Sequence, residues 1–219
     1  MKALLAGGIE SLSSGRVLVV VPIRSTRNDV VATLGPAGTS SEAAGHALSQ
    51  MLAVDPDGES EAASPVALYP SYEAASSAVL NESAARLLVA NAYHGVNAFY
   101  MEPRLALECA FVFDPPQYGV AARSVDPLPF RTRVATHPAP EALLHQLPVA
   151  GTMVAEVEYV LSTSAAAALV AQGGADLALT TAPAARLHGL HFVSGTRCIR
   201  MLWSVFVRQV TLSETRTSW

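Results

Sequence analysis

The chain contains 219 residues, with 14 lysine and arginine residues against 18 aspartate and glutamate residues and a formal net charge of −4. That acidic balance argues against a nucleic-acid-binding protein, which usually carries a basic stripe. Although 51% of the residues are hydrophobic, no uninterrupted apolar run approaches the roughly 18 residues that a membrane-spanning helix needs.

The first 28 residues show little periodic pattern and are expected to form an N-terminal extension. Within them, Val17 to Ile23 is a short β-branched run that could be an extra strand or simply an extension, and residues 1–9 lack an apolar stretch followed by a cleavage site. The two cysteines of the chain have no zinc-ligand spacing, which favours reduced thiols. We therefore expect a cytoplasmic protein without a bound metal.

A strand, a glycine-rich turn and a helix are predicted from residue 29 onward. Val30 to Leu34 forms the strand, Gly35 to Ser41 forms the turn, and apolar residues keep helical spacing from Ala43 to Leu52. Ser40 or Ser41 would cap this helix. Because free backbone N–H groups at a helix start favour an anion, Thr39, Ser40 and Ser41 are candidate ligands of a carboxylate. A tight turn with a helix cap explains the same residues equally well.

Strands and helices alternate through the rest of the chain, which predicts an α/β architecture with mostly parallel sheets. Ser162, Thr163 and Ser164 offer a second helix start with hydroxyl groups, and Gly173 and Gly174 end that helix. In such folds ligands bind at the carboxyl ends of strands, which directs attention to residues 35–41, 91–95, 136–138, 162–164 and 180–182. Further strands are expected over 66–69, 86–90, 105–113, 118–122, 133–136, 153–161, 176–180, 190–193 and 201–207, and further helices over 71–80, 141–147 after Pro140, and 183–188.

Three side chains in or near these turns are candidates for chemistry. His94, beside Asn91 and Tyr93, and His137 could donate a proton, although a histidine in such a turn is more often structural. Arg123 could clamp a carboxylate because its planar guanidinium binds both oxygens; an ordinary surface arginine is the alternative. The spacing of His188 and His191 is metal-like, but they flank a helix end and a strand start, which favours a structural role.

Two motifs resemble signatures of the prephenate dehydratase superfamily. Thr33 to Ala43 resembles its opening Gly-Pro-x-Gly-Thr turn, and Ser162 to Ala167 resembles its second signature, Ser-Thr-x-x-Ala-Ala. The finer resemblance is to the smaller branch of non-aromatising prephenate decarboxylases, found in pathways to bacilysin, anticapsin and related antibiotics. The segments that carry it are Thr39–Glu42, Ala92–Val96, Phe99–Met101, Tyr118–Arg123, His137–Pro138, Asp176–Thr180 and Met201–Ser204.

This resemblance implies a two-lobed fold like that of type II periplasmic binding proteins, with an active-site cleft between the lobes. The expected catalytic domain covers 29–210, with one lobe over 29–104 plus 190–210 and the other over 105–189. No regulatory ACT domain is expected, because about a dozen residues follow Val207. The resemblance also implies prephenate as the small-molecule substrate, no metal or organic cofactor, and no nucleic-acid or membrane partner, and it is compatible with a homodimer.

One departure from the dehydratases concerns the ring hydroxyl of prephenate. In those enzymes a threonine in a late strand helps this hydroxyl to leave, and here Met201 stands at the matching position. A thioether cannot donate a proton, so the hydroxyl would be retained while CO2 is lost. The departure therefore favours decarboxylation to a non-aromatic 4-hydroxycyclohexadienyl pyruvate.

The expected site combines these residues. The proton could come from Tyr93, His94 or His137, or from a substrate-assisted transfer. An apolar wall near the ring carboxylate would be formed by Met201 and Trp203. Two other functions stay open, a dehydratase that makes phenylpyruvate and a non-catalytic module that binds small anions. The residues expected to bind substrate are Thr39, Ser40, Ser41, Asn91, Arg123, Ser162, Thr163, Ser164, Thr180 and Trp203.

Overall fold

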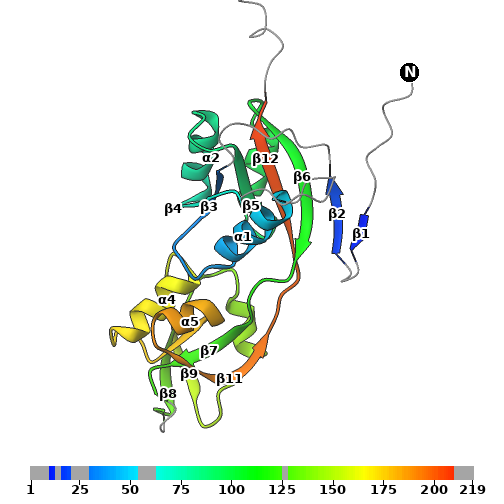
Figure 1. Cartoon of the computed structure of the whole chain (residues 1–219). Coiled ribbons are helices and arrows are strands. Elements are labelled where there is room, and N and C mark those ends of the chain that lie inside the picture. The colour runs from blue at the N-terminus through cyan, green and yellow to red at the C-terminus, as the bar shows by residue number, and fades with distance from the viewer. Residues whose placement is uncertain (1–9, 13–15, 21–29, 54–62, 125–127, 210–219) are drawn as a thin grey trace, which may run out of the picture. The chain divides into compact units, whose positions relative to one another are not determined.

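The computed structural model describes residues 10–12, 16–20, 30–53, 63–124 and 128–209, and these residues form two compact units (Figure 1). Among these described residues, unit 1 comprises those up to residue 34, those from 45 to 113 and those from 201 onward, and unit 2 comprises those from 35 to 44 and from 114 to 200. None of the helices among the described residues is long and apolar enough to cross a membrane.

The boundaries of these units differ from the lobes expected from the sequence at two strands. β6 (Leu105–Phe113) belongs to unit 1, because it pairs along its length with β12 (Met201–Arg208). β11 (His191–Arg197) belongs to unit 2, because it pairs with β7 (Tyr118–Ala122). Hydrogen-bonded partners, which the sequence does not reveal, thus decide to which unit each connecting strand belongs.

Unit 1 contains a seven-stranded sheet in the order β1-β2-β6-β12-β5-β3-β4. β12 lies in its centre, antiparallel to both β6 and β5, as Figure 1 shows. The predicted N-terminal strand is present as β2, paired with β6, and the expected residues 21–23 of it lie outside the described part. The other strands are β1 (Glu10–Leu12), β2 (Arg16–Val20), β3 (Val31–Leu34), β4 (Val66–Tyr69) and β5 (Arg86–Ala90).

The helices that form the core of unit 1 together with its sheet are α1 (Ser40–Leu52), α2 (Tyr72–Leu80) and α3 (Val96–Met101). α1 begins in unit 2 and continues in unit 1 from residue 45. A side chain at Gly45 would lie 2.9 Å from Cγ1 of Val66, so glycine permits a close approach of α1 to β4. Burial of each large apolar side chain contributes about 1.5–3 kcal/mol, and the fully buried ones include Val31, Leu48, Leu87, Leu88, Val89 and Phe206.

A buried ion pair crosses this sheet. Nε of Arg86 on β5 donates a 2.9 Å hydrogen bond to Oε2 of Glu108 on β6, and their side chains are only 3% and 10% exposed. Glu108 lies at a β-bulge, since Val205 of β12 faces Cys109 and Phe206 faces Leu107. The extra residue of the bulge therefore supplies the carboxylate that neutralises Arg86.

Unit 2 contains a five-stranded sheet in the order β11-β7-β10-β8-β9. Its helices α4 (Thr163–Ala171) and α5 (Ala182–Leu187) pack on the sheet through alanines. Such small side chains let helix and strand backbones approach closely. The remaining strands are β8 (Arg131–Thr136), β9 (Met153–Tyr159) and β10 (Leu177–Thr181), and the shared core contains Ala121, Ala135, Ala166, Ala167, Ala178 and Ala184.

The prediction of mostly parallel sheets is wrong, because both sheets are mixed. Among the described strands, β3 pairs in parallel with β4 and β5, and β8 with β9 and β10, whereas six other pairs are antiparallel. Parallel neighbours need a crossover connection such as a helix. The connections β6 to β7 and β11 to β12 lack a crossover helix but join strands of different sheets, so the antiparallel neighbours of β6 and β11 come from elsewhere in the chain.

Two local predictions also differ from the structure. The helix expected over 141–147 is a single 3₁₀ turn, η1 (Glu141–His145), in which Pro140 is the N-cap rather than the first helical residue. The short helix α3 was not expected. By contrast, Ser162 caps α4 and Gly173 adopts a φ of +84° just beyond its end, as predicted.

Candidate functional site

The carboxyl edge of the unit 2 sheet collects most of the predicted site. Thr136 at the end of β8 faces Tyr159 at the end of β9, and β10 runs parallel to β8 and ends at Thr181. Tyr118, which opens the antiparallel β7, faces Thr181. The turns after these strands therefore lie at one edge. They bring together His137, Ser162, Thr163, Ser164 and Thr180.

The glycine-rich turn before α1 joins this edge through two hydrogen bonds. Oγ1 of Thr181 donates to the carbonyl of Gly38 at 2.6 Å, and the hydroxyl groups of Ser40 and Tyr118 lie 2.7 Å apart. Gly38 has a φ of +83°, and a Cβ there would lie 3.0 Å from Cα of Ala184. Only glycine fits this close approach of the turn to α5.

The cap of α1 is not the one predicted. Oγ1 of Thr39, rather than Ser40 or Ser41, accepts from the backbone N–H of Glu42 at 3.3 Å. Oε2 of Glu42 in turn accepts from the N–H of Gly38 at 2.7 Å. This arrangement resembles a capping box, so a carboxylate of the chain itself already satisfies one donor of the turn.

The start of α4 is built from buried hydroxyl groups. Ser162 caps the helix by accepting from the N–H of Ala165 at 2.9 Å, and Thr180 donates to the carbonyl of Thr163 at 2.7 Å. Oγ of Ser164 lies 3.5 Å from Nε2 of His188. The start of α4 thus lies among neutral hydroxyl groups, an environment that favours a carboxylate, whereas the start of α1 already holds the carboxylate of Glu42.

Sequence reasoning missed Tyr118 and Thr181, which join the turn to this edge. Both are buried, and burial raises the pKa of the Tyr118 hydroxyl above its usual value. The sequence predicts the strand over residues 118–122, but it does not show that Tyr118 faces Thr181. The register of β7 against β10 supplies that information.

Arg123 is not brought together with these groups. Its side chain is exposed, and Nη1 donates at 2.9 Å to the carbonyl of Val170 in the last turn of α4. At 1.5 Å per residue, that carbonyl lies about 12 Å along the helix from Ser162. The structure therefore places Arg123 at the carboxyl end of α4, where its charge complements the helix dipole.

In unit 1, the predicted residues that follow β5 have separate environments. The hydroxyl of Tyr93 donates to Oε1 of Glu73 at 2.7 Å, and its ring contacts those of Tyr72, His94 and Phe99. This hydrogen bond raises the pKa of Tyr93 to about 12 and lowers that of Glu73. Tyr93 thus holds its proton tightly, while His94 lies on its ring and is exposed.

The two residues of the predicted apolar wall, Met201 and Trp203, lie two positions apart at the start of β12 and therefore on the same face of the strand. Met201 is half-buried and pairs with Phe113. Trp203 is 0% exposed, and its Nε1 has no hydrogen-bond partner among the described residues. Trp203 is therefore a core side chain of unit 1. Beside it, Ser204 contacts Asn91 and Tyr100 on the opposite side of the strand.

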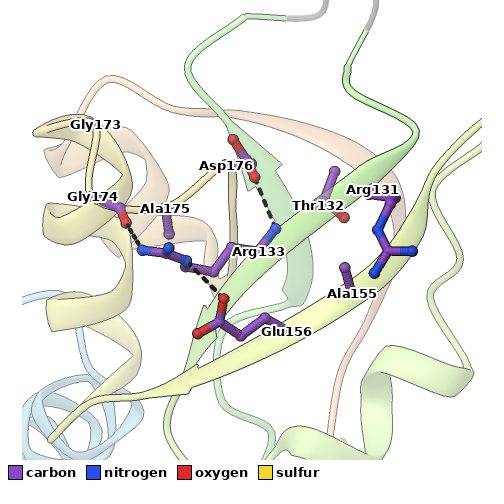
Figure 2. A pocket seen from close by; sticks show the side chains of 9 residues that line it. All are labelled: Arg131, Thr132, Arg133, Ala155, Glu156, Gly173, Gly174, Ala175 and Asp176. Atoms are coloured by element: carbon purple, nitrogen blue, oxygen red, sulfur yellow. Dashed lines mark hydrogen bonds and ion pairs between the residues drawn. The ribbon is translucent and has the colours of Figure 1, made fainter.

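A cavity of about 360 Å³ lies at the amino ends of β8 and β10, the end opposite the candidate site (Figure 2). Arg133 there donates to Glu156 and to the carbonyl of Gly174, both at 3.2 Å, and its backbone N–H donates to Asp176 at 2.8 Å. Because these internal partners neutralise Arg133, we do not place the substrate carboxylate there. Within the described ranges, no group of three His, Cys, Asp or Glu side chains is arranged to hold a metal ion.

Two curated relatives match most of the chain. A prephenate decarboxylase from Planktothrix agardhii (strain NIVA-CYA 126/8) is 37% identical over 193 residues, which cover 84% of this chain and 90% of the relative. A prephenate decarboxylase from Bacillus subtilis is 34% identical over 179 residues, which cover 80% and 84%. No protein-family model matches the chain.

Solved structures show the fold. A prephenate dehydratase from Arthrobacter aurescens in complex with L-Phe has a TM-score of 0.59 at 18% identity, and the match covers 84% of this chain but 61% of that one. A nutrient-binding protein from Burkholderia cenocepacia bound to methionine has a TM-score of 0.51 at 13% identity, covering 87% and 88%. The fold expected from the sequence is thereby confirmed, apart from the strand directions.

Proposed function

The chain belongs to the prephenate decarboxylase family, and on this premise we propose that it converts prephenate to CO2 and a non-aromatic 4-hydroxycyclohexadienyl pyruvate. The observation that carries the proposal is 37% identity to such an enzyme over 84% of the chain. In the reaction, the bond between the ring and its carboxylate breaks and its electron pair forms a new ring double bond. The electron pair of the adjacent ring double bond is displaced and takes up one proton at the ring carbon next to the carbon that bears the hydroxyl group.

We assign the pyruvyl carboxylate of the substrate to the carboxyl edge of unit 2. Support comes from the start of α4 and from the hydroxyl groups of Ser40, Tyr118 and Ser164, which lie at that edge. Neutral donors and helix dipoles stabilise an anion without adding a strong acid to the site. An ordered carboxylate also fixes the orientation of the ring.

The ring proton is assigned to His137. Its Nδ1 accepts from the N–H of Ala139 at 3.2 Å, so in the neutral ring Nε2 carries the hydrogen. Tyr93 is a poorer acid, because Glu73 holds its proton and its pKa is about 12. His137→Gln is expected to lower kcat by about 100-fold, a typical contribution of general acid catalysis. A kcat within threefold of wild type would transfer this role to the substrate itself.

Retention of the ring hydroxyl is assigned in part to Met201. Its thioether is the first side chain of β12 and offers no proton to a departing hydroxyl. Loss of water would make the ring aromatic, so a site that stops at decarboxylation must withhold a proton from that oxygen. The substitution that tests this role is described in the Discussion.

The test of the function is NMR of the purified protein incubated with prephenate at neutral pH. An acid quench is avoided, because acid itself aromatises prephenate. A dihydro-4-hydroxyphenylpyruvate product would support the proposal. Phenylpyruvate as the main product would make the protein a dehydratase, and unchanged prephenate would overturn the enzymatic proposal in favour of a binding module.

The cellular setting belongs to the same proposal. We place the enzyme in the cytoplasm, in a secondary pathway that uses the non-aromatic product, and as a homodimer. The two cysteines, Cys109 and Cys198, are not joined by a disulfide bond, which suits a reducing compartment. Light scattering during size-exclusion chromatography would determine the oligomeric state.

A further inference from the structure

We propose that the cavity at the amino ends of β8 and β10 binds a small zwitterion, a molecule with one carboxylate and one ammonium group as in an α-amino acid. The inference goes beyond the assigned reaction, since this cavity lies at the end of the unit 2 sheet opposite the candidate site. Every residue that lines the cavity belongs to unit 2. Its volume of about 360 Å³ lies in the range of small-molecule sites.

Small residues keep this cavity open, and polar residues form the rest of its wall. A Cβ at Gly173 would lie 2.9 Å from Nη1 of Arg123, and a Cβ at Gly174 would lie 2.4 Å from Cδ1 of Leu169, so neither position has room for a side chain. The wall at the end of α4 is therefore backbone. The lining residues with no side chain beyond a methyl group are Ala155, Gly173, Gly174 and Ala175, and the polar ones are Arg131, Thr132, Arg133, Glu156 and Asp176.

Arg131 supplies an unpaired positive charge. Arg131 and Arg133 lie two positions apart on β8 and therefore on the same face of the strand. Arg133 pairs with carboxylates of β9, whereas Arg131 has no hydrogen bond or ion pair within the part of the chain that the structure describes. Figure 2 shows the guanidinium of Arg131 pointing toward β9. Because a guanidinium can bind both oxygens of a carboxylate, the carboxylate of the ligand is assigned to Arg131.

A β-bulge in β9 lies in the same cavity. Thr132 faces Val154 and Arg133 faces Glu156, which leaves Ala155 as the extra residue of β9. The extra residue of a bulge is left out of the hydrogen-bond ladder, and Ala155 lines the cavity. The neighbouring strand β8 therefore leaves the backbone groups of Ala155 open to a ligand.

Two carboxylates of the cavity can still accept hydrogen bonds. Oδ2 of Asp176 accepts from the backbone N–H of Arg133 at 2.8 Å, and Oε2 of Glu156 accepts from Nε of Arg133 at 3.2 Å. Among the described residues, the other oxygen of each carboxylate has no hydrogen-bond donor. Arg133 also lies 3.7 Å from Glu158, so its one positive charge faces two glutamates. Negative charge is thus left over for an ammonium group.

These charges discriminate between classes of ligand. Inorganic phosphate would meet Arg131 but would also face the carboxylates of Glu156 and Asp176. A simple ammonium ion would meet these carboxylates but would face Arg131. A zwitterion places each of its charges near an opposite one, and the small residues of the wall leave room for a short side chain.

NMR titration of the full chain with L-alanine tests the site. Spectra of ¹⁵N-labelled protein at neutral pH and constant ionic strength follow the amides of Ala155, Gly174 and Asp176. Propionate and ethylammonium are the matched probes, because each lacks one charged group of alanine. We expect saturable shifts with L-alanine and a Kd at least about tenfold higher for each fragment, as for loss of a hydrogen bond to a charged group. Shifts that rise linearly with L-alanine, or equal affinity for propionate, would overturn the proposal.

Arg131→Gln and Glu156→Gln each remove one charge that the proposal uses. Each variant is expected to raise the Kd for L-alanine about 10- to 100-fold. Arg186→Gln is the matched control, because Arg186 is an arginine of α5 outside the cavity, and it should leave the Kd unchanged. All three side chains are exposed, so the variants should fold, and their Tm values check this. Unchanged affinity in Arg131→Gln would overturn the proposal.

The titration also locates the bound probe. If the largest shifts occur at the amides of Ser162, Thr163 and Ser164, L-alanine binds at the candidate substrate edge and the proposal fails. Inorganic phosphate that binds more tightly than L-alanine would replace the zwitterion by a simple anion and would overturn the proposal as well. The measurement needs no turnover of prephenate, so its outcome is distinct from that of the test of the proposed function.

Discussion

The hydroxyl group of Tyr93 donates a 2.7 Å hydrogen bond to the carboxylate of Glu73, and this bond holds the pKa of Tyr93 at about 12 instead of 10.0. Because the folded-state pKa of Tyr93 is raised, its contribution to stability is complete below pH 10 and is lost as the pH rises from about 10 to about 12. The free energy of unfolding of wild type should thus approach that of Tyr93→Phe over this range. A difference between them that stays constant up to pH 12 would contradict the prediction.

The same bond lowers the pKa of Glu73. The contribution of Glu73 to the free energy of unfolding is therefore present above the ordinary pKa of 4.5 and is lost as the pH falls through the lowered pKa. Glu73→Gln provides the control. In this variant the pKa of Tyr93 should move down toward 10, as followed by tyrosinate absorbance near 295 nm.

Met201→Thr is expected to add phenylpyruvate to the products, because a threonine hydroxyl can direct a hydrogen at the ring hydroxyl. Product analysis by NMR at neutral pH measures the ratio of the two compounds. Met201→Val serves as the control, since it shortens the side chain without adding a donor. A Met201→Thr product mixture free of phenylpyruvate would count against the assigned role.

Arg123→Ala tests the position of Arg123 at the carboxyl end of α4. Loss of its bond to the carbonyl of Val170 should reduce the free energy of unfolding by about 1 kcal/mol or less, with kcat/KM within twofold of wild type. Had Arg123 clamped the substrate carboxylate, removal would cost about 2–4 kcal/mol in kcat/KM. Steady-state kinetics and urea unfolding distinguish these outcomes.

Glu108→Ala should be strongly destabilising, because it removes the carboxylate that pairs with the buried guanidinium of Arg86. Such a loss typically costs about 3–5 kcal/mol. Glu156→Ala is the matched control, since its pair with Arg133 is solvent-exposed and should change stability by less than about 1 kcal/mol. Equal effects of the two substitutions would contradict this account.

The elements that the sequence predicted best are those with clear ends. β4, β5, β6 and β7 match their expected ranges, and α2 begins one residue later than expected, with Ser71 as its N-cap. Apolar runs bounded by proline, glycine or serine mark such elements locally. Strand direction and partner depend on distant residues, which explains why the parallel prediction failed and why β6 and β11 joined units other than the expected ones.

The candidate site shows the same division between local and distant information. Neighbouring residues determine a helix start such as that of α4, so the sequence predicts the start over Ser162, Thr163 and Ser164, and the structure shows that Ser162 is the cap. Tyr118 acquires its position from its pairing with Thr181, and Arg123 from the reach of a long side chain to α4. The local sequence signals neither contact.

The place of β12 in the middle of the unit 1 sheet has a consequence for synthesis of the chain. β12 is the last described strand to leave the ribosome, yet it separates β6 from β5. Until it arrives, both neighbours have an unpaired edge of the kind that recruits foreign strands. Nascent chains that stall after residue 200 should therefore aggregate or bind chaperones, whereas completion of one late strand closes both edges at once.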